Sequence, residues 1–69
     1  MTARETFRKG QRVRTTQHAV DVGVVKAEET GTVVGFGRIS NLEVRVLLDG
    51  RVSPVSYHLK FWVAARGEG

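Results

Sequence analysis

The chain is 69 residues long and has no cysteine, and its 11 lysines and arginines against 7 acidic residues give a formal net charge of +4. The lack of cysteine excludes a disulfide-stapled secreted miniprotein and a thiolate metal site, and it suits a reducing cytoplasm. A chain this short makes one domain that buries only about 60% of its unfolded surface, so nearly every large apolar side chain is needed for the core. The positive charge favours acidic partners without defining them.

The two ends of the chain differ in composition from its middle. Residues 1–6 and 64–69 are mainly polar or small, and we expect them to be flexible termini around a single folded domain at residues 7–63. The sequence has no apolar run of membrane-spanning length, and MTARETFRKG lacks the apolar core of a signal peptide. We therefore expect a cytoplasmic protein that does not engage a membrane.

The first predicted strand follows a Lys-Gly turn and covers residues 11–16. Val13 and Thr15 fall on one face of it, whereas Arg12 and Arg14 fall on the other. This alternation is typical of a half-buried strand, and its solvent face is basic.

A long connection at residues 17–29 follows, and the sequence leaves its conformation open. The alternation of Val20, Val22 and Val24 suits a flexible β-arm, whereas residues 27–29 suit a single helical turn. We keep both alternatives.

A second strand is predicted at residues 32–36, with Val34 and Phe36 on one face and Val33 on the other. Gly35 has no side chain to pack, which suits a bend or the close approach of another strand. The surrounding GTVVGFG superficially resembles a nucleotide-binding glycine motif, but such motifs lead into a helix, and here a loop and another strand follow. We therefore interpret these glycines as structural.

After a loop at residues 38–42, residues 43–48 alternate as a half-buried strand should. Its inward side chains are predicted to be Val44, Val46 and Leu48, and its outward ones include Glu43 and Arg45.

Asp49 and Gly50 suit a type I′ hairpin turn, in which both central residues have positive φ. The return strand is predicted at residues 51–55, with Pro54 at an edge or a bend because proline cannot donate a ladder hydrogen bond. Strands this short cannot bury themselves singly, so four or five of them predict a small all-β barrel.

Three stretches resemble small SH3-like barrels of the KOW and Tudor type: FRKGQRVR at residues 7–14, GTVVG at 31–35 and VRVLLDG at 44–50. The resemblance implies an all-β barrel of about five short antiparallel strands with a terminal 3-10 turn. GTVVGF, VRVLLDG and the ending YHLKFW at residues 57–62 are also similar to small uncharacterised proteins of phages and prophages. That family implies a phage-type protein and supplies no activity.

A weaker resemblance is to the plasmid-borne type II dihydrofolate reductases, which are tetramers of an SH3-like barrel. Residues 10–14, 31–35 and Tyr57 are similar, but that family has a Val-Gln-Ile-Tyr run where this chain reads PVSY. Its paired lysines are two threonines here. Both differences remove groups that would hold the ligands of the reductase, so we do not expect this activity.

Candidate catalytic groups are few. His18 and His58 are the two imidazoles, and Ser56 shares a face with His58 if the segment is extended, but no third orienting group is near. A structural histidine is the favoured interpretation. Two histidines without cysteine also lack the spacing of a metal site. We expect no catalytic residue, no metal and no cofactor, and so a protein that is not an enzyme.

The outward arginines are the first candidate binding residues. Arg12, Arg14, Arg45 and Arg51 would form a basic face able to bind phosphate oxygens if their strands bring them to one side. Acidic residues lie among them and would weaken such a site. A merely solvated face is the alternative.

The ending YHLKFW holds three of the chain's five Phe, Tyr and Trp residues. We predict that Leu59 and Phe61 plug the core, because burying each contributes about 1.5–3 kcal/mol, a large part of the stability of so small a domain. Tyr57, His58 and Trp62 are predicted to form an edge that contacts a partner, with Tyr57 and Trp62 half-exposed because each combines apolar surface with a polar group.

These features predict a non-enzymatic binding module of phage or prophage type that engages a host or phage protein. The alternative is a DNA- or RNA-binding barrel that acts through the arginine face. A third hypothesis is an enzyme built by oligomerisation around a symmetric pore.

Overall fold

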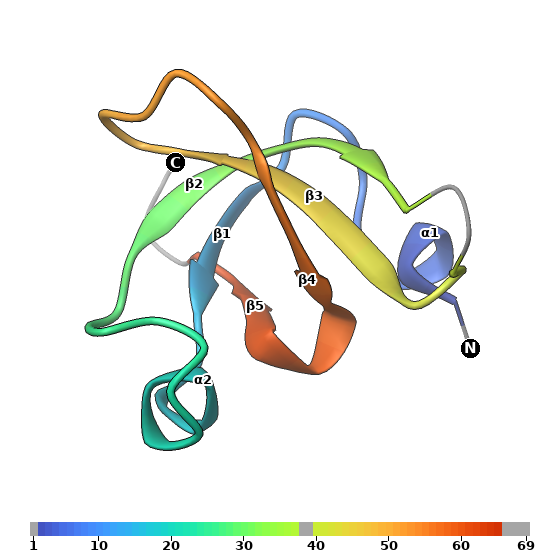
Figure 1. Ribbon diagram of the computed structural model, residues 1–69. Coiled ribbons are helices and arrows are strands. Elements are labelled where there is room, and N and C mark those ends of the chain that lie inside the picture. The colour runs from blue at the N-terminus through green and yellow to red at the C-terminus, as the bar shows by residue number, and fades with distance from the viewer. Residues whose placement is uncertain (1, 38–39, 66–69) are drawn as a thin grey trace.

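The computed structural model describes residues 2–37 and 40–65, which form five strands, two short α-helices and one 3-10 helix (Figure 1). The strands are β1 (Arg12–Thr15), β2 (Thr30–Phe36), β3 (Glu43–Leu48), β4 (Val55–His58) and β5 (Trp62–Ala64). The helices are α1 (Ala3–Thr6), α2 (Gln17–Asp21) and the 3-10 helix η1 (Leu59–Phe61).

One antiparallel sheet contains all five strands, in the order β4-β3-β2-β1-β5. Its edge strands, β4 and β5, are consecutive in the chain and are joined by the three residues of η1 alone. The sheet must therefore curl until its edges nearly meet, and Figure 1 shows it curled in this way. The prediction of a small all-β domain with about five antiparallel strands and a terminal 3-10 turn is confirmed.

The core is built from the inward faces predicted for the first and third strands. Val13 and Thr15 of β1 are fully buried, and so are Val44, Val46 and Leu48 of β3. The period of two in the sequence identified these faces because successive side chains of a strand point to opposite sides of the sheet.

Strand β2 crosses the middle of the sheet and is irregular near Gly35. Its pairing with β3 shifts register between Val33 and Gly35, which is the bend expected there. The close approach of strands occurs instead at Gly31, where a Cβ atom would lie 2.5 Å from the carbonyl oxygen of Leu47. Only glycine lets β2 and β3 come this near at that point.

The connection between β3 and β4 differs from the prediction. Gly50 has a φ of +81°, but Asp49 does not have a positive φ, which rules out the type I′ turn. The return strand begins at Val55 and not at Arg51, so residues 49–54 form a loop. A proline immediately before the strand delays pairing, because it has no N–H to donate to the ladder.

The connection between β1 and β2, residues 17–29, adopts neither of the two predicted conformations, which were a flexible β-arm and a helical turn at residues 27–29. Helix α2 begins it, capped by the Thr16 hydroxyl, which accepts the N–H of Ala19 at 3.2 Å. At the far end, Thr15 donates its N–H to the Glu29 carbonyl and accepts the Glu29 N–H on its hydroxyl, both at 2.8 Å. The N–H of Val22 donates to the His18 carbonyl and that of Val24 to the Ala19 carbonyl, whereas a lone β-arm has no partner strand for its backbone groups.

The packed part of the chain begins before the predicted boundary at Phe7. Ala3 in α1 is fully buried, and its N–H donates to the Asn41 carbonyl at 2.7 Å, which ties α1 to the turn before β3 (Figure 1). Residues 66–69 of the predicted C-terminal tail, and residues 38 and 39 of the predicted loop, lie outside the described residues. Of the described helices, none has the length and apolar character needed to cross a membrane.

Candidate functional site

Arg12 belongs to a hydrogen-bonded network on the outer face of the sheet. Its guanidinium donates to both carboxylate oxygens of Asp49, at 2.8 and 2.6 Å, and to the Thr32 hydroxyl at 3.0 Å. The Thr30 hydroxyl donates to the same carboxylate at 2.9 Å. These four residues, which we call the Arg12 network, link β1 and β2 to the turn after β3. The forked contact is among the strongest that an arginine and a carboxylate make.

The network keeps Asp49 ionised. The hydrogen bond from Arg12, and after it the one from Thr30, lower the pKa of Asp49 from its ordinary 3.8 to about 2. The side chains of Arg12 and Asp49 are 33% and 53% exposed, so water screens part of their attraction. Arg12 is thus part of the scaffold, and its charge is neutralised locally.

Arg51 lies in the loop of residues 49–54 and reaches the connection between β1 and β2. Its Nη2 donates to Oε1 of Glu29 at 3.3 Å, a single and longer contact between side chains that are 54% and 30% exposed. Beside this pair is a cleft of about 510 Å³, which we call the Arg51 cleft. It is lined by Val24, Val25, Lys26, Ala27, Glu29, Arg51 and Tyr57.

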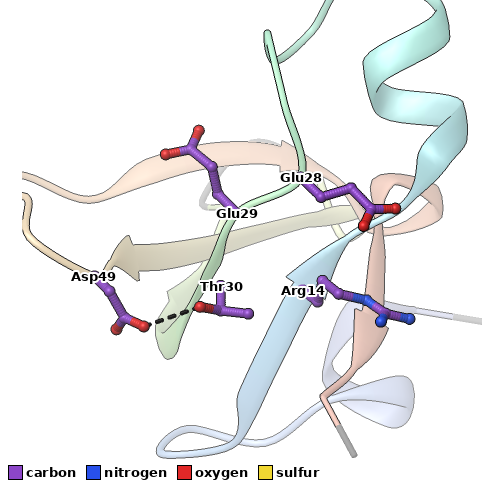
Figure 2. Close-up of a pocket in the computed structure, with 5 residues that line it drawn as sticks. All are labelled: Arg14, Glu28, Glu29, Thr30 and Asp49. Carbon is purple, nitrogen blue, oxygen red and sulfur yellow. Dashed lines mark hydrogen bonds between the residues drawn. The ribbon is translucent and has the colours of Figure 1, made fainter.

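A second hollow, of about 350 Å³, shares Glu29 with the Arg51 cleft and is lined also by Arg14, Glu28, Thr30 and Asp49 (Figure 2). Figure 2 shows Glu28 and Arg14 extending to one side of it, and Glu29 and Asp49 to the other. Because Glu29 and Asp49 are each held by an arginine outside this hollow, its remaining charges are one carboxylate and one guanidinium.

The four predicted arginines do not form one continuous basic face. Strand β2 separates β1 from β3, and Arg14 lies opposite Thr30, whereas Arg45 lies opposite Gly35. Five residues of extended strand place these two positions about 16 Å apart along β2. The other two arginines are each paired with a carboxylate. The arrangement is that of a mixed-charge surface.

In the YHLKFW segment, the side chain that is buried is not one of those that the sequence predicted to be buried. The prediction that Trp62 is half-exposed is wrong, because only 4% of the residue is accessible and it belongs to the hydrophobic core. It opens β5 opposite Thr15, on the inner face of the sheet. Leu59 and Phe61, the predicted plug, are half-buried. Tyr57 is half-buried as well, and its ring stacks on Trp62 with 5.7 Å between centroids and 18° between planes.

Both histidines contact Phe61. The His18 ring stacks on it at 5.7 Å between centroids, and the His58 ring meets its edge at 6.5 Å. Nδ1 of His58 also accepts the backbone N–H of Lys60 at 3.0 Å and so caps η1. Ser56 and His58 share a face of β4 as the extended segment requires. His58 therefore has a structural task at the point where the sheet closes.

Of the predicted contact residues, the structure brings Arg51 and Tyr57 together in one cleft. The rest of that cleft comes from the connection whose conformation the sequence left open, and sequence reasoning missed it. The threonine before QHAVD is a signal that would have predicted α2. No local signal places residues 24–29 against a loop that lies more than twenty positions later.

No protein-family model matches the chain, and no curated protein or solved structure is significantly similar to it. The geometry of the site is therefore the basis for assigning a function.

Proposed function

We propose that this protein is a non-enzymatic binding module that engages a protein partner, through the surface that contains the Arg51 cleft and the neighbouring hollow. The similarity to phage and prophage proteins suggests a host or phage protein as that partner. The observation that supports the proposal most is the mixed character of the cleft, which offers valine, alanine and tyrosine surface beside charges of both signs. Protein interfaces typically combine aromatic and arginine side chains with apolar contacts in this way.

Nucleic-acid binding is the competing function, and it needs a run of cations that follows a phosphate backbone. Here Arg14 and Arg45 lie far apart along the sheet, and Asp49 and Glu29 neutralise the two arginines near them. A polyanion approaching this surface would meet carboxylates between the cations. The distribution of charge thus favours a protein partner.

The test is a pull-down from lysate of the native host, with and without nuclease, together with gel-shift titrations against DNA and RNA at ~50 mM salt. We expect a protein that stays bound after nuclease treatment, and no gel shift. An unrelated protein of similar size and charge serves as the control bait for capture by charge alone. Loss of all bound protein after nuclease, with a gel shift at low salt, would contradict the proposal.

A further inference from the structure

The walls of the Arg51 cleft are fixed by contacts that need no ligand. At one end of the wall formed by residues 24–29, the N–H of Val24 donates to the Ala19 carbonyl at 2.9 Å. At the other end, the Glu29 carbonyl accepts the N–H of the buried Thr15, and the Glu29 N–H donates to the Thr15 hydroxyl. A binding surface that is already ordered loses little conformational entropy when a partner docks.

Contacts within the protein also hold Arg51 and Tyr57, which line the rest of the cleft. The backbone N–H of Arg51 donates to the Leu48 carbonyl at 3.0 Å and fixes the start of its loop. Tyr57 pairs with Val44 in the sheet, and its ring stacks on the buried Trp62. The tyrosine therefore presents a supported aromatic surface to the cleft.

The charges of the cleft are incompletely paired. The cleft is lined by two cationic side chains, Lys26 and Arg51, and by one carboxylate, Glu29, so its net charge is positive by one. Arg51 uses one N–H on Glu29, although a guanidinium has five N–H donors in a planar fork. Within residues 2–37 and 40–65, no second acceptor contacts this guanidinium and no carboxylate forms an ion pair with Lys26. One further carboxylate would neutralise the cleft, whereas a group with several negative charges would be repelled by Glu29.

The apolar surface of the cleft adds a second requirement. Val24, Ala27 and Tyr57 line a volume of about 510 Å³, which is larger than a carboxylate group alone would fill. A large apolar side chain placed against the tyrosine ring would remove this surface from water.

Building on the protein-binding function above, we propose that the Arg51 cleft binds a protein segment in which an acidic residue stands next to a large apolar residue. The carboxylate of that segment pairs with Arg51 and Lys26. Its apolar side chain packs against Tyr57 and Val24. The partner is thus selected by one negative charge and one apolar group held side by side.

The proposal is tested with end-blocked synthetic peptides that are neutral except at one position, where phenylalanine is followed by glutamate, glutamine or lysine. Binding is followed through the backbone amide NMR signals of the folded protein. We expect the glutamate peptide to shift the signals of Lys26, Ala27 and Tyr57 and to bind about fivefold more tightly than the glutamine peptide, as one partly exposed charge pair implies. The lysine peptide should bind most weakly.

The matched variants are Arg51→Gln, which removes the net positive charge of the cleft and leaves Lys26 balanced by Glu29, and Arg45→Gln, which removes an exposed charge elsewhere on the sheet. Arg51→Gln should reduce binding of the glutamate peptide to the level of the glutamine peptide, and Arg45→Gln should leave the preference unchanged. Equal binding of the two peptides, an unchanged preference in Arg51→Gln, or the absence of binding by any peptide would overturn the proposal.

The failure of this proposal can be told apart from failure of the protein-binding function. If the pull-down retains a nuclease-resistant protein while the peptides show no preference for glutamate, a protein partner binds elsewhere and the cleft assignment is wrong. If a short oligothymidylate shifts the amide signals and the peptides do not, the protein-binding function is itself wrong.

Discussion

Arg12 and Arg51 each face a carboxylate on the same side of this small barrel, yet the two pairs differ in almost every physical respect. Arg12 forks onto Asp49 through contacts of 2.8 and 2.6 Å, with two threonine hydroxyls completing the network. Arg51 reaches Glu29 through one contact of 3.3 Å between two loops. The first pair ties β1 to the turn after β3, and the second borders a cleft.

The difference teaches how to interpret exposed arginines in a short basic chain. An arginine whose donors are shared between a forked carboxylate and a neighbouring hydroxyl stabilises the scaffold, and a ligand would have to displace those partners. An arginine with a single long contact keeps donors for another molecule. The four predicted arginines are alike in the sequence, but they are not alike in this respect.

The largest expected effect comes from removing Trp62, a buried core residue that stacks on Tyr57 of the Arg51 cleft. Trp62→Ala should lower the free energy of unfolding by about 3–5 kcal/mol, enough to unfold most of the population of so small a domain. Circular dichroism during urea titration measures this. Val52→Ser is the control, because Val52 is 98% exposed and its loss should change little. A Trp62→Ala protein as stable as the wild type would show that another residue plugs the core.

The second prediction concerns the fork in the Arg12 network. Arg12→Lys keeps the positive charge but cannot bridge both oxygens of Asp49, so we expect the free energy of unfolding to fall by about 1 kcal/mol. The same replacement at Arg45, which has no ion pair among the described residues, should have no measurable effect. Equal urea midpoints for the two variants would mean that the fork adds nothing to stability.

The third prediction is a dependence of stability on pH that comes from Asp49. The pKa of Asp49 is about 2 in the folded protein and below its ordinary 3.8, because Arg12 and Thr30 donate hydrogen bonds to the ionised carboxylate. The stabilisation is therefore present above the ordinary pKa of 3.8 and is lost progressively as the pH falls through 3.8 towards 2. Asp49→Asn should lack this part of the acid-induced loss in urea unfolding between pH 5 and pH 2. If the two proteins lose stability in parallel, the network does not hold the charge.

The smallest effect is expected at the other pair. Arg51→Gln should change the free energy of unfolding by less than about 0.5 kcal/mol, since the contact with Glu29 is single, long and exposed. Urea unfolding beside Arg12→Lys makes the comparison directly. A loss as large as that of Arg12→Lys would show that Arg51 is also a scaffold residue and would remove the contrast between the two pairs.

The sequence alone predicted the parts of the fold that depend on local geometry. The alternation in β1 and β3 identified Val13, Val44 and Val46 as core residues, because the period of a strand is fixed by its own backbone. Gly35 marked the irregular point of β2 for a similar reason. The sequence did not predict where β4 begins. The Asp-Gly signal describes the two central residues of a turn, and it does not determine the strand pairing that follows.

What the tertiary structure decided is which distant groups meet. Arg12 and Asp49 are 37 positions apart in the chain, and their contact depends on β2 lying between β1 and β3. The burial of Trp62 depends on β5 pairing with β1, which no periodicity of YHLKFW reports. Residue types and spacing thus determined the barrel and its inward faces, whereas the order of strands in the closed sheet determined which arginine forks onto a carboxylate and which one borders a cleft. The physical reason is that side-chain alternation is a property of one strand, but an ion pair is a property of two segments brought together by the fold.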